Sequence, residues 1–148
     1  MTKKQPNILF ILTDQQRLDS IGAYGAHLAK TPVLDELAAN GTRFEQAYTP
    51  ATVCSPARAS VFTGLYPHQH GVKRNSADIR HDVPNFAGSL IDAGYRLGFC
   101  GKWHIDDVYG PTHFGFEAND WLGYSHPAGD LYMRSFHNTC KYPVNHYK

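Results

Sequence analysis

Residues 6–15 read Pro6-Asn7-Ile8-Leu9-Phe10-Ile11-Leu12-Thr13-Asp14-Gln15, a continuous apolar run that ends in a carboxylate. A run without alternating polar residues is typical of a strand that is buried on both faces, as in a parallel sheet covered by helices. Open α/β sheets bind their ligands at the carboxyl ends of such strands. Asp14 is therefore placed to bind a hard divalent cation through oxygen, the alternative being a carboxylate that caps a following helix.

Signals for helices and strands alternate along the next ninety or so residues. Thr31 and Pro32 predict the start of a helix that Gly41 ends, and residues 83–93 predict another that Gly94 ends. Their inward faces are predicted to carry Leu34, Leu37 and Ala38 in the first helix and Phe86, Leu90 and Ile91 in the second. Residues 43–49 and 95–100 predict strands. This order predicts an α/β fold, a mostly parallel sheet flanked by helices with right-handed crossovers.

A thiol, a helix start and a guanidinium fall within one turn at Cys54-Ser55-Pro56-Ala57-Arg58. Pro56 suits the first helical position, which predicts that Cys54 lies just outside a helix N-terminus, where backbone N–H groups favour an anion. Arg58 can return its planar fork of donors to the same end, and Gly64 closes the helix. The arrangement indicates a nucleophile held beside an anion. The alternative is an ordinary buried cysteine before a short helix.

The pattern Cys54-x-Pro56-x-Arg58, followed after an apolar spacer by Thr63-Gly64, resembles the signature of the formylglycine-dependent sulfatases of the alkaline phosphatase superfamily. The resemblance implies that Cys54 is converted to 3-oxoalanine (formylglycine) by a formylglycine-generating or anaerobic sulfatase-maturing enzyme. One hydroxyl of the hydrated aldehyde would attack sulfur, and the other would later expel the sulfate. The implied function is the hydrolysis of sulfate esters, with a small sulfated molecule as substrate.

A second match lies at residues 94–104, which end in Gly101-Lys102-Trp103-His104 and resemble the other sulfatase signature. Lys102 and His104 are predicted to emerge past the carboxyl end of the strand at residues 95–100. The resemblance implies that Lys102 neutralises the sulfate and that His104 lies near the nucleophile or the leaving-group oxygen. Leu97 departs from the family pattern, which usually has a small hydroxyl residue there. Without the resemblance, Lys102 and His104 would be interpreted as surface residues.

The family often has two adjacent aspartates where this chain has Asp14-Gln15. An amide oxygen can still coordinate, so the resemblance implies a metal site of Asp14, Gln15 and residue 54, with Ca²⁺ expected first and Mn²⁺ or Mg²⁺ as alternatives. A similar Asp-Gln start occurs in bacterial choline sulfatase-like and phosphonate monoester hydrolase-like relatives. A second function therefore stays open, the hydrolysis of phosphonate monoesters or phosphodiesters at the same site.

Two further parts of the chain are assigned roles, the turn after the Cys54 helix and the segment 106–148. Asn75 follows the Cys54 helix, where related hydrolases place a polar side chain near the transferred group, and it is the candidate substrate-binding residue; the alternative is a plain turn residue. His70 is interpreted as structural. Residues 106–148 predict a loop-rich segment that in sulfatases forms part of the substrate cleft. Its polar and aromatic residues either pack against the sheet, as we favour, or help to select the alcohol: Trp121, Tyr124, His126 and Tyr132.

Composition and length bound these hypotheses. The 148 residues carry a formal net charge of +1, three cysteines and no basic block, which predicts no nucleic-acid partner, no disulfide framework and a cytoplasmic location. No run approaches the ~20 apolar residues of a membrane span. Residues 1–148 are expected to form the N-terminal part of a longer sulfatase domain, with residues 1–105 carrying the motifs. The third hypothesis is therefore a truncated, non-catalytic remnant or anion-binding fragment whose incomplete sheet exposes apolar edges.

Overall fold

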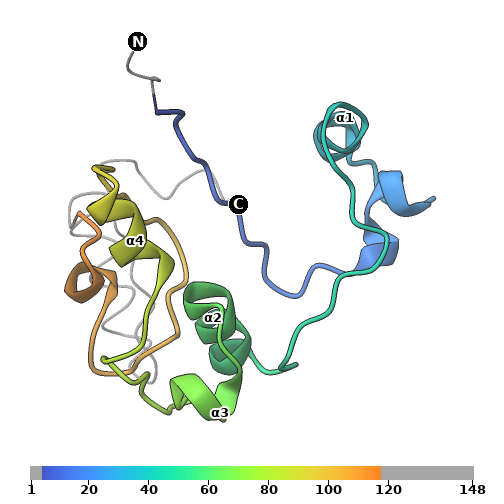
Figure 1. Cartoon of the computed structure of the whole chain (residues 1–148). Helices are drawn as coiled ribbons and strands as arrows, with labels where there is room; N and C mark the ends of the chain where they lie inside the picture. Colours follow the sequence, from blue (N-terminus) through green and yellow to red (C-terminus); the bar gives the residue numbers. More distant parts are fainter. Residues whose placement is uncertain (1–4, 118–148) are drawn as a thin grey trace, which may run out of the picture. The chain divides into compact units, whose positions relative to one another are not determined.

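The computed structural model describes residues 5–117, which fall into two compact units, Met1–Ala47 (unit 1) and Tyr48–Lys148 (unit 2). Figure 1 shows α1 in unit 1 and α2, α3 and α4 in unit 2. The four residues that were expected to pack against the sheet, or alternatively to help select the alcohol, lie outside the described residues: Trp121, Tyr124, His126 and Tyr132. Among residues 5–117, no helix is long and apolar enough to cross a membrane.

Unit 1 contains two short 3-10 helices, η1 (Leu18–Ser20) and η2 (Gly22–Tyr24), followed by α1 (Pro32–Asn40). The predicted helix start at Thr31 and Pro32 is confirmed, but the Thr31 side chain does not cap its own helix. Its hydroxyl accepts from Gly22 N at 2.8 Å and donates to Asp35 Oδ1 at 3.0 Å. The backbone N–H of Ala23 also donates to Asp35 Oδ1, at 2.6 Å. Thr31 and Asp35 therefore fasten η2 to the first turn of α1.

The strands predicted in unit 1 are absent from the described structure. Residues 8–12 are 46–84% exposed, and neither they nor residues 43–49 are in strands. Leu34 and Leu37 of α1 are 39% and 60% exposed, so the predicted inward stripe is not buried either. A strand that is buried on both faces needs neighbouring strands for its backbone groups and helices above and below it. Within residues 5–117 the only strand-like pairing is a single parallel bridge between Gly98 and Glu117.

Unit 2 begins with α2 (Cys54–Thr63), which carries the first signature. The helix starts at Cys54 with Val53 as its N-cap residue, so the prediction that Pro56 is the first helical residue and that Cys54 lies outside the helix is wrong by two positions. The first intrahelical bond runs from Ala57 N to Val53 O at 3.0 Å. Pro56 precedes that bond, and its missing N–H therefore costs nothing. Gly64 ends the helix in the left-handed region (φ 72°), as predicted.

The helix predicted at residues 83–93 forms as a shorter element, α4 (Phe86–Asp92). Val83 precedes Pro84, and a residue before proline is disfavoured in the helical region. The helix starts instead at Asn85, whose side chain accepts from Gly88 N at 2.9 Å. The strand predicted at residues 95–100 is represented by the Gly98 bridge alone. Two further turns were not predicted, α3 (Pro67–His70) and η3 (Pro111–Phe114).

The core of unit 2 is organised around the ring of Phe62 on α2. This ring is 2% exposed and makes edge-on contacts, at centroid distances of 5.2–5.3 Å, with Phe86, Trp103 and Phe114. Those three residues come from α4, from the second signature and from η3. Aromatic pairs in such geometry add to the stabilisation from burial. Phe62 therefore fixes α2 against the segment that carries Lys102 and His104.

Candidate active site

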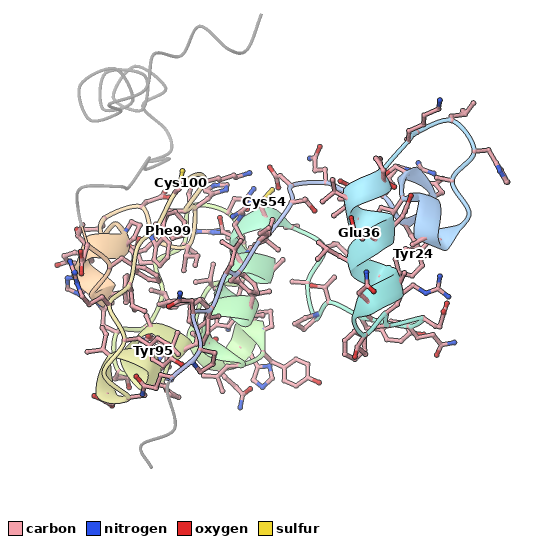
Figure 2. The ribbon with its side chains drawn as sticks, turned by 90° about the horizontal axis from the view of Figure 1, so that it is seen from above. Tyr24, Glu36, Cys54, Tyr95, Phe99 and Cys100 are labelled. Carbon is pink, nitrogen blue, oxygen red and sulfur yellow. The ribbon has the colours of Figure 1, made fainter. Side chains whose placement is uncertain are left out.

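Cys54 occupies the first turn of α2, as Figure 2 shows, and its residue is half-buried. The next two residues, Ser55 and Pro56, are buried and anchor the helix start in unit 2. Cys54 and Cys100, the two cysteines in the described part of the chain, are both free thiols. The thiol thus lies where the unpaired N–H groups of a helix start favour negative charge.

Asn75 is brought to this helix start across twenty residues of sequence. Its side-chain oxygen accepts from Ser55 N at 3.1 Å, which satisfies one N–H of the first turn of α2. Because a backbone N–H can only donate, the atom that faces it must be the amide oxygen. The amide NH₂ of the same side chain is then a donor fixed close to Cys54, and Asn75 itself is exposed.

Arg58 joins the two signatures. Its Nη1 donates to the backbone carbonyl of Lys102 at 2.7 Å, across 44 residues of sequence. Arg58 and Lys102 are both half-buried. A charged donor makes a stronger hydrogen bond than a neutral one. The contact holds two cationic residues in one region of unit 2. One of the guanidinium donors is used for this hydrogen bond to the backbone.

The second signature is rigid around Trp103. The indole is 3% exposed and donates through Nε1 to Tyr109 O at 3.0 Å. His104 is only 6% exposed, which differs from the surface position that a polar residue after a strand would have. Its backbone lies in the left-handed region at φ 52°, a conformation that a non-glycine residue keeps only when its surroundings impose it.

Ser60 of α2 and His70 form a buried pair that supports this helix. Only His70 was predicted to be structural. His70 is completely buried, and its Nδ1 accepts from Val72 N at 3.2 Å. The proton therefore resides on Nε2, which lies 3.0 Å from Ser60 Oγ and donates to it. Burial lowers the pKa of His70 and keeps the ring neutral. Sequence reasoning missed Ser60, because its partner is ten residues away and no local pattern links the two.

Asp14 and Gln15 lie in unit 1, whereas the other predicted site residues lie in unit 2. Both residues are exposed, and Gln15 has a left-handed backbone at φ 54°. A carboxylate and an amide oxygen are suitable donors for a hard cation such as Ca²⁺. Within residues 5–117, however, no group of three or more His, Cys, Asp or Glu side chains that could hold a metal ion is found. The donor chemistry fits the implied ion, and the described residues supply only part of a coordination shell.

Comparisons with known proteins identify the family of this chain. The sulfatase family matches residues 6–146. The chain is 41% identical over 112 residues to the uncharacterised sulfatase YidJ of Escherichia coli, covering 76% of this chain and 22% of the relative. It is 33% identical over 141 residues to an N-acetylglucosamine-6-O-sulfatase of Bacteroides thetaiotaomicron, covering 95% and 25%.

Among solved structures, the phosphonate monoester hydrolase of Agrobacterium radiobacter superposes with a TM-score of 0.65 at 28% identity, covering 82% of this chain and 26% of that one. The chain thus spans about a quarter of the length of the curated relatives that it matches. Because the family match reaches from the first apolar run almost to the last residue, the chain belongs to the sulfatase family, as a counterpart of its N-terminal part.

Proposed function

We propose that the protein hydrolyses sulfate esters at a site built on the first turn of α2. The observation that carries the proposal is the hydrogen bond from Arg58 to Lys102 O, which joins the two sulfatase signatures in one unit. A helix N-terminus and cationic side chains both favour negative charge, so a helix start with Arg58 on it and Lys102 bonded to Arg58 through its carbonyl suits a tetrahedral anion. Arg58 would hold residue 54 and the anion, and Lys102 would neutralise the sulfate.

The remaining roles are those that the family resemblance implies, and they are consistent with the donor chemistry of each residue. As formylglycine, residue 54 would supply the attacking hydroxyl. Asp14 and Gln15 would hold a divalent cation, which supplies charge neutralisation at the ester oxygens when it is bound. The NH₂ group of Asn75, whose oxygen is occupied by Ser55 N, would donate to a sulfate oxygen. His104 would move the proton of the leaving group or the nucleophile.

The apolar run at residues 8–12 has a structural role in this proposal. We expect it to form an inner strand of the mostly parallel, alkaline phosphatase-like sheet once neighbouring strands are supplied. Asp14 would then lie at the carboxyl edge of that sheet, where ligand sites gather. The location in the cytoplasm and the maturing enzyme as a partner remain part of the same proposal.

The conversion of Cys54 tests the proposal directly. Trypsin cleaves after Arg43 and Arg58, so the peptide 44–58 carries Cys54, whereas the peptide 97–102 carries the exposed Cys100. In protein from the native host, we expect the first peptide to lose about 18 Da by exchange of the thiol for an aldehyde. Cys100 is the internal control, because it should remain an alkylatable thiol. A fully alkylated Cys54 would contradict the sulfatase mechanism and favour a non-catalytic remnant.

A second candidate, the hydrolysis of phosphonate monoesters or phosphodiesters, is supported by the Asp14-Gln15 pair and by the similarity to the Agrobacterium hydrolase. Both substrate classes present a tetrahedral anion to the same cations, so charge does not separate them. The similarity to the Bacteroides enzyme suggests a sulfated amino sugar as the first substrate to test. Rates of hydrolysis of N-acetylglucosamine-6-sulfate, an aryl sulfate and an aryl phosphonate monoester by the modified protein would rank the candidates. Phosphonate turnover without sulfate release would reverse our order.

A further inference from the structure

We propose that His81 and His113 form a binding site for a divalent transition-metal ion, with Zn²⁺, Ni²⁺ or Cu²⁺ as the candidate ions. The site lies in unit 2, uses none of the residues assigned to ester hydrolysis and would join the loop after Ile79 to η3. Its two imidazoles come from positions 32 residues apart. The proposal rests on the contact between these two rings and on the buried carboxylate of Asp106, which lies 3.3 Å from the His81 ring.

The distance between the two ring nitrogens suits a shared metal ion. His81 Nδ1 and His113 Nε2 lie 3.0 Å apart. With metal–nitrogen bonds of about 2.0–2.1 Å, two cis ligands of one ion lie about 2.9–3.4 Å apart in square-planar or tetrahedral geometry. The separation of the two nitrogens therefore already suits the ion, and the two rings would rotate so that both lone pairs point to it.

Asp106 orients His81 for this role. Its side chain is completely buried; Oδ1 accepts from Val108 N at 2.8 Å and from Tyr109 N at 2.7 Å, and Oδ2 accepts from Ile79 N at 3.3 Å. Oδ2 also lies 3.3 Å from His81 Nε2. Because a carboxylate can only accept, this contact favours the tautomer in which Nε2 carries the proton and Nδ1 keeps its lone pair toward His113. This is the carboxylate–histidine–metal arrangement that fixes metal-binding histidines in many proteins.

Neighbouring groups hold the rings and leave the site accessible. The ring of Tyr109 contacts both imidazoles, at centroid distances of 4.8 Å from His81 and 4.2 Å from His113. The His81 side chain is 37% exposed and His113 is exposed, so water can enter and complete the coordination shell. Since no third His, Cys, Asp or Glu joins them within residues 5–117, the described site supplies two protein ligands.

Ligand type separates this site from the oxygen site expected at Asp14 and Gln15. Imidazole nitrogen favours Cu²⁺, Ni²⁺ and Zn²⁺, whereas Ca²⁺ and Mg²⁺ prefer oxygen. In the tautomer that the Asp106 contact favours, His113 Nε2 carries the proton and donates it to His81 Nδ1. When the ion binds, this proton moves to His113 Nδ1 or to solvent, and the lone pair of Nε2 is donated to the ion. Because the ion would link two segments only in the folded state, binding should raise the midpoint of thermal unfolding.

The test is a calorimetric titration of the tag-free 148-residue protein with ZnCl₂ and NiCl₂, with CaCl₂ as the comparison ion. We expect binding of Zn²⁺ and Ni²⁺ that weakens at least about tenfold in His81→Asn and in His113→Asn, since each removes one of two ligands. His68→Asn is the matched control, because His68 is an exposed histidine that contacts Tyr66 and lies outside the cluster. Asp106→Asn should weaken binding by roughly 10–100-fold while both ligands remain. Equal affinities in the wild type, His81→Asn and His113→Asn would overturn the proposal.

A second measurement uses only the wild-type protein, so it tests the proposal even when the variants fail to fold. In NMR spectra of the wild-type imidazoles, substoichiometric Zn²⁺ should shift the His81 and His113 ring signals together and leave His68 in place. Absence of a shift at either ring would also overturn the proposal. Neither experiment depends on ester hydrolysis, so failure of the metal site and failure of the sulfatase proposal are distinguishable.

Discussion

At the scale of single residues, the burial of His70 makes the free energy of unfolding depend on pH. Its folded pKa is lowered by burial, whereas the unfolded chain titrates near the ordinary value of about 6.5. Above that value the ring is neutral in both states, and its contribution to stability is fully present. As the pH falls through 6.5 toward the folded pKa, the unfolded state binds more protons, so the free energy of unfolding decreases.

The first prediction compares the wild type with His70→Asn, whose amide oxygen can still accept from Val72 N but cannot titrate. We expect the free energy of unfolding to fall more steeply in the wild type than in the variant between about pH 7.5 and pH 5. Urea denaturation followed by tryptophan fluorescence measures both curves. Parallel pH dependences would show that His70 does not stay neutral in the folded protein.

The second prediction separates the two functions of the Asn75 amide. Asn75→Asp keeps an oxygen for Ser55 N but loses the NH₂ donor, whereas Asn75→Ala loses both. We expect Asn75→Ala to cost about 1 kcal/mol of stability and Asn75→Asp only a few tenths. Under the proposed function, Asn75→Asp should nevertheless raise the KM for the sulfate ester at least about tenfold, because a carboxylate repels the anion. Unchanged KM values in both variants would remove Asn75 from the substrate site.

At the scale of secondary-structure elements, α2 depends on the contacts of one ring. Phe62→Ala removes a 2% exposed side chain that touches α4, the second signature and η3, and we expect a loss of about 3–5 kcal/mol. Val61→Ala, on the same helix but 44% exposed, is the matched control and should cost less than about 1 kcal/mol. Denaturant unfolding gives both values. Similar losses for the two variants would mean that α2 is not anchored through Phe62.

The same elements show what the sequence could predict. Helix starts and ends have local causes, and Pro32 and Gly64 were located correctly for that reason. The predicted strands depend on pairing with segments far along the chain, and the structure describes no strand at residues 8–12. In the candidate site, the signatures named Arg58 and Lys102, but their hydrogen bond depends on tertiary packing and was not predictable. The contact between His81 and His113 could not be predicted from the sequence for the same reason.

At the scale of the whole molecule, the chain exposes a contiguous apolar segment at residues 8–12. Ile8, Leu9, Phe10, Ile11 and Leu12 are all at least 46% exposed, and they are contiguous. The chain spans about a quarter of the length of the curated relatives that it matches. A continuous exposed apolar run favours association with other chains.

The last prediction follows from that exposure. The 148-residue chain should self-associate through residues 8–12, and Leu9→Lys should lower its light scattering severalfold, because a lysine side chain blocks apolar contact and adds charge repulsion between copies. Leu28→Lys is the matched control: Leu28 is 101% exposed but is not part of an apolar run, so the same change of charge should have little effect there. Light scattering and gel filtration across a concentration series measure the difference. If both lysine variants reduce association equally, net charge rather than the apolar run governs the solubility of the chain.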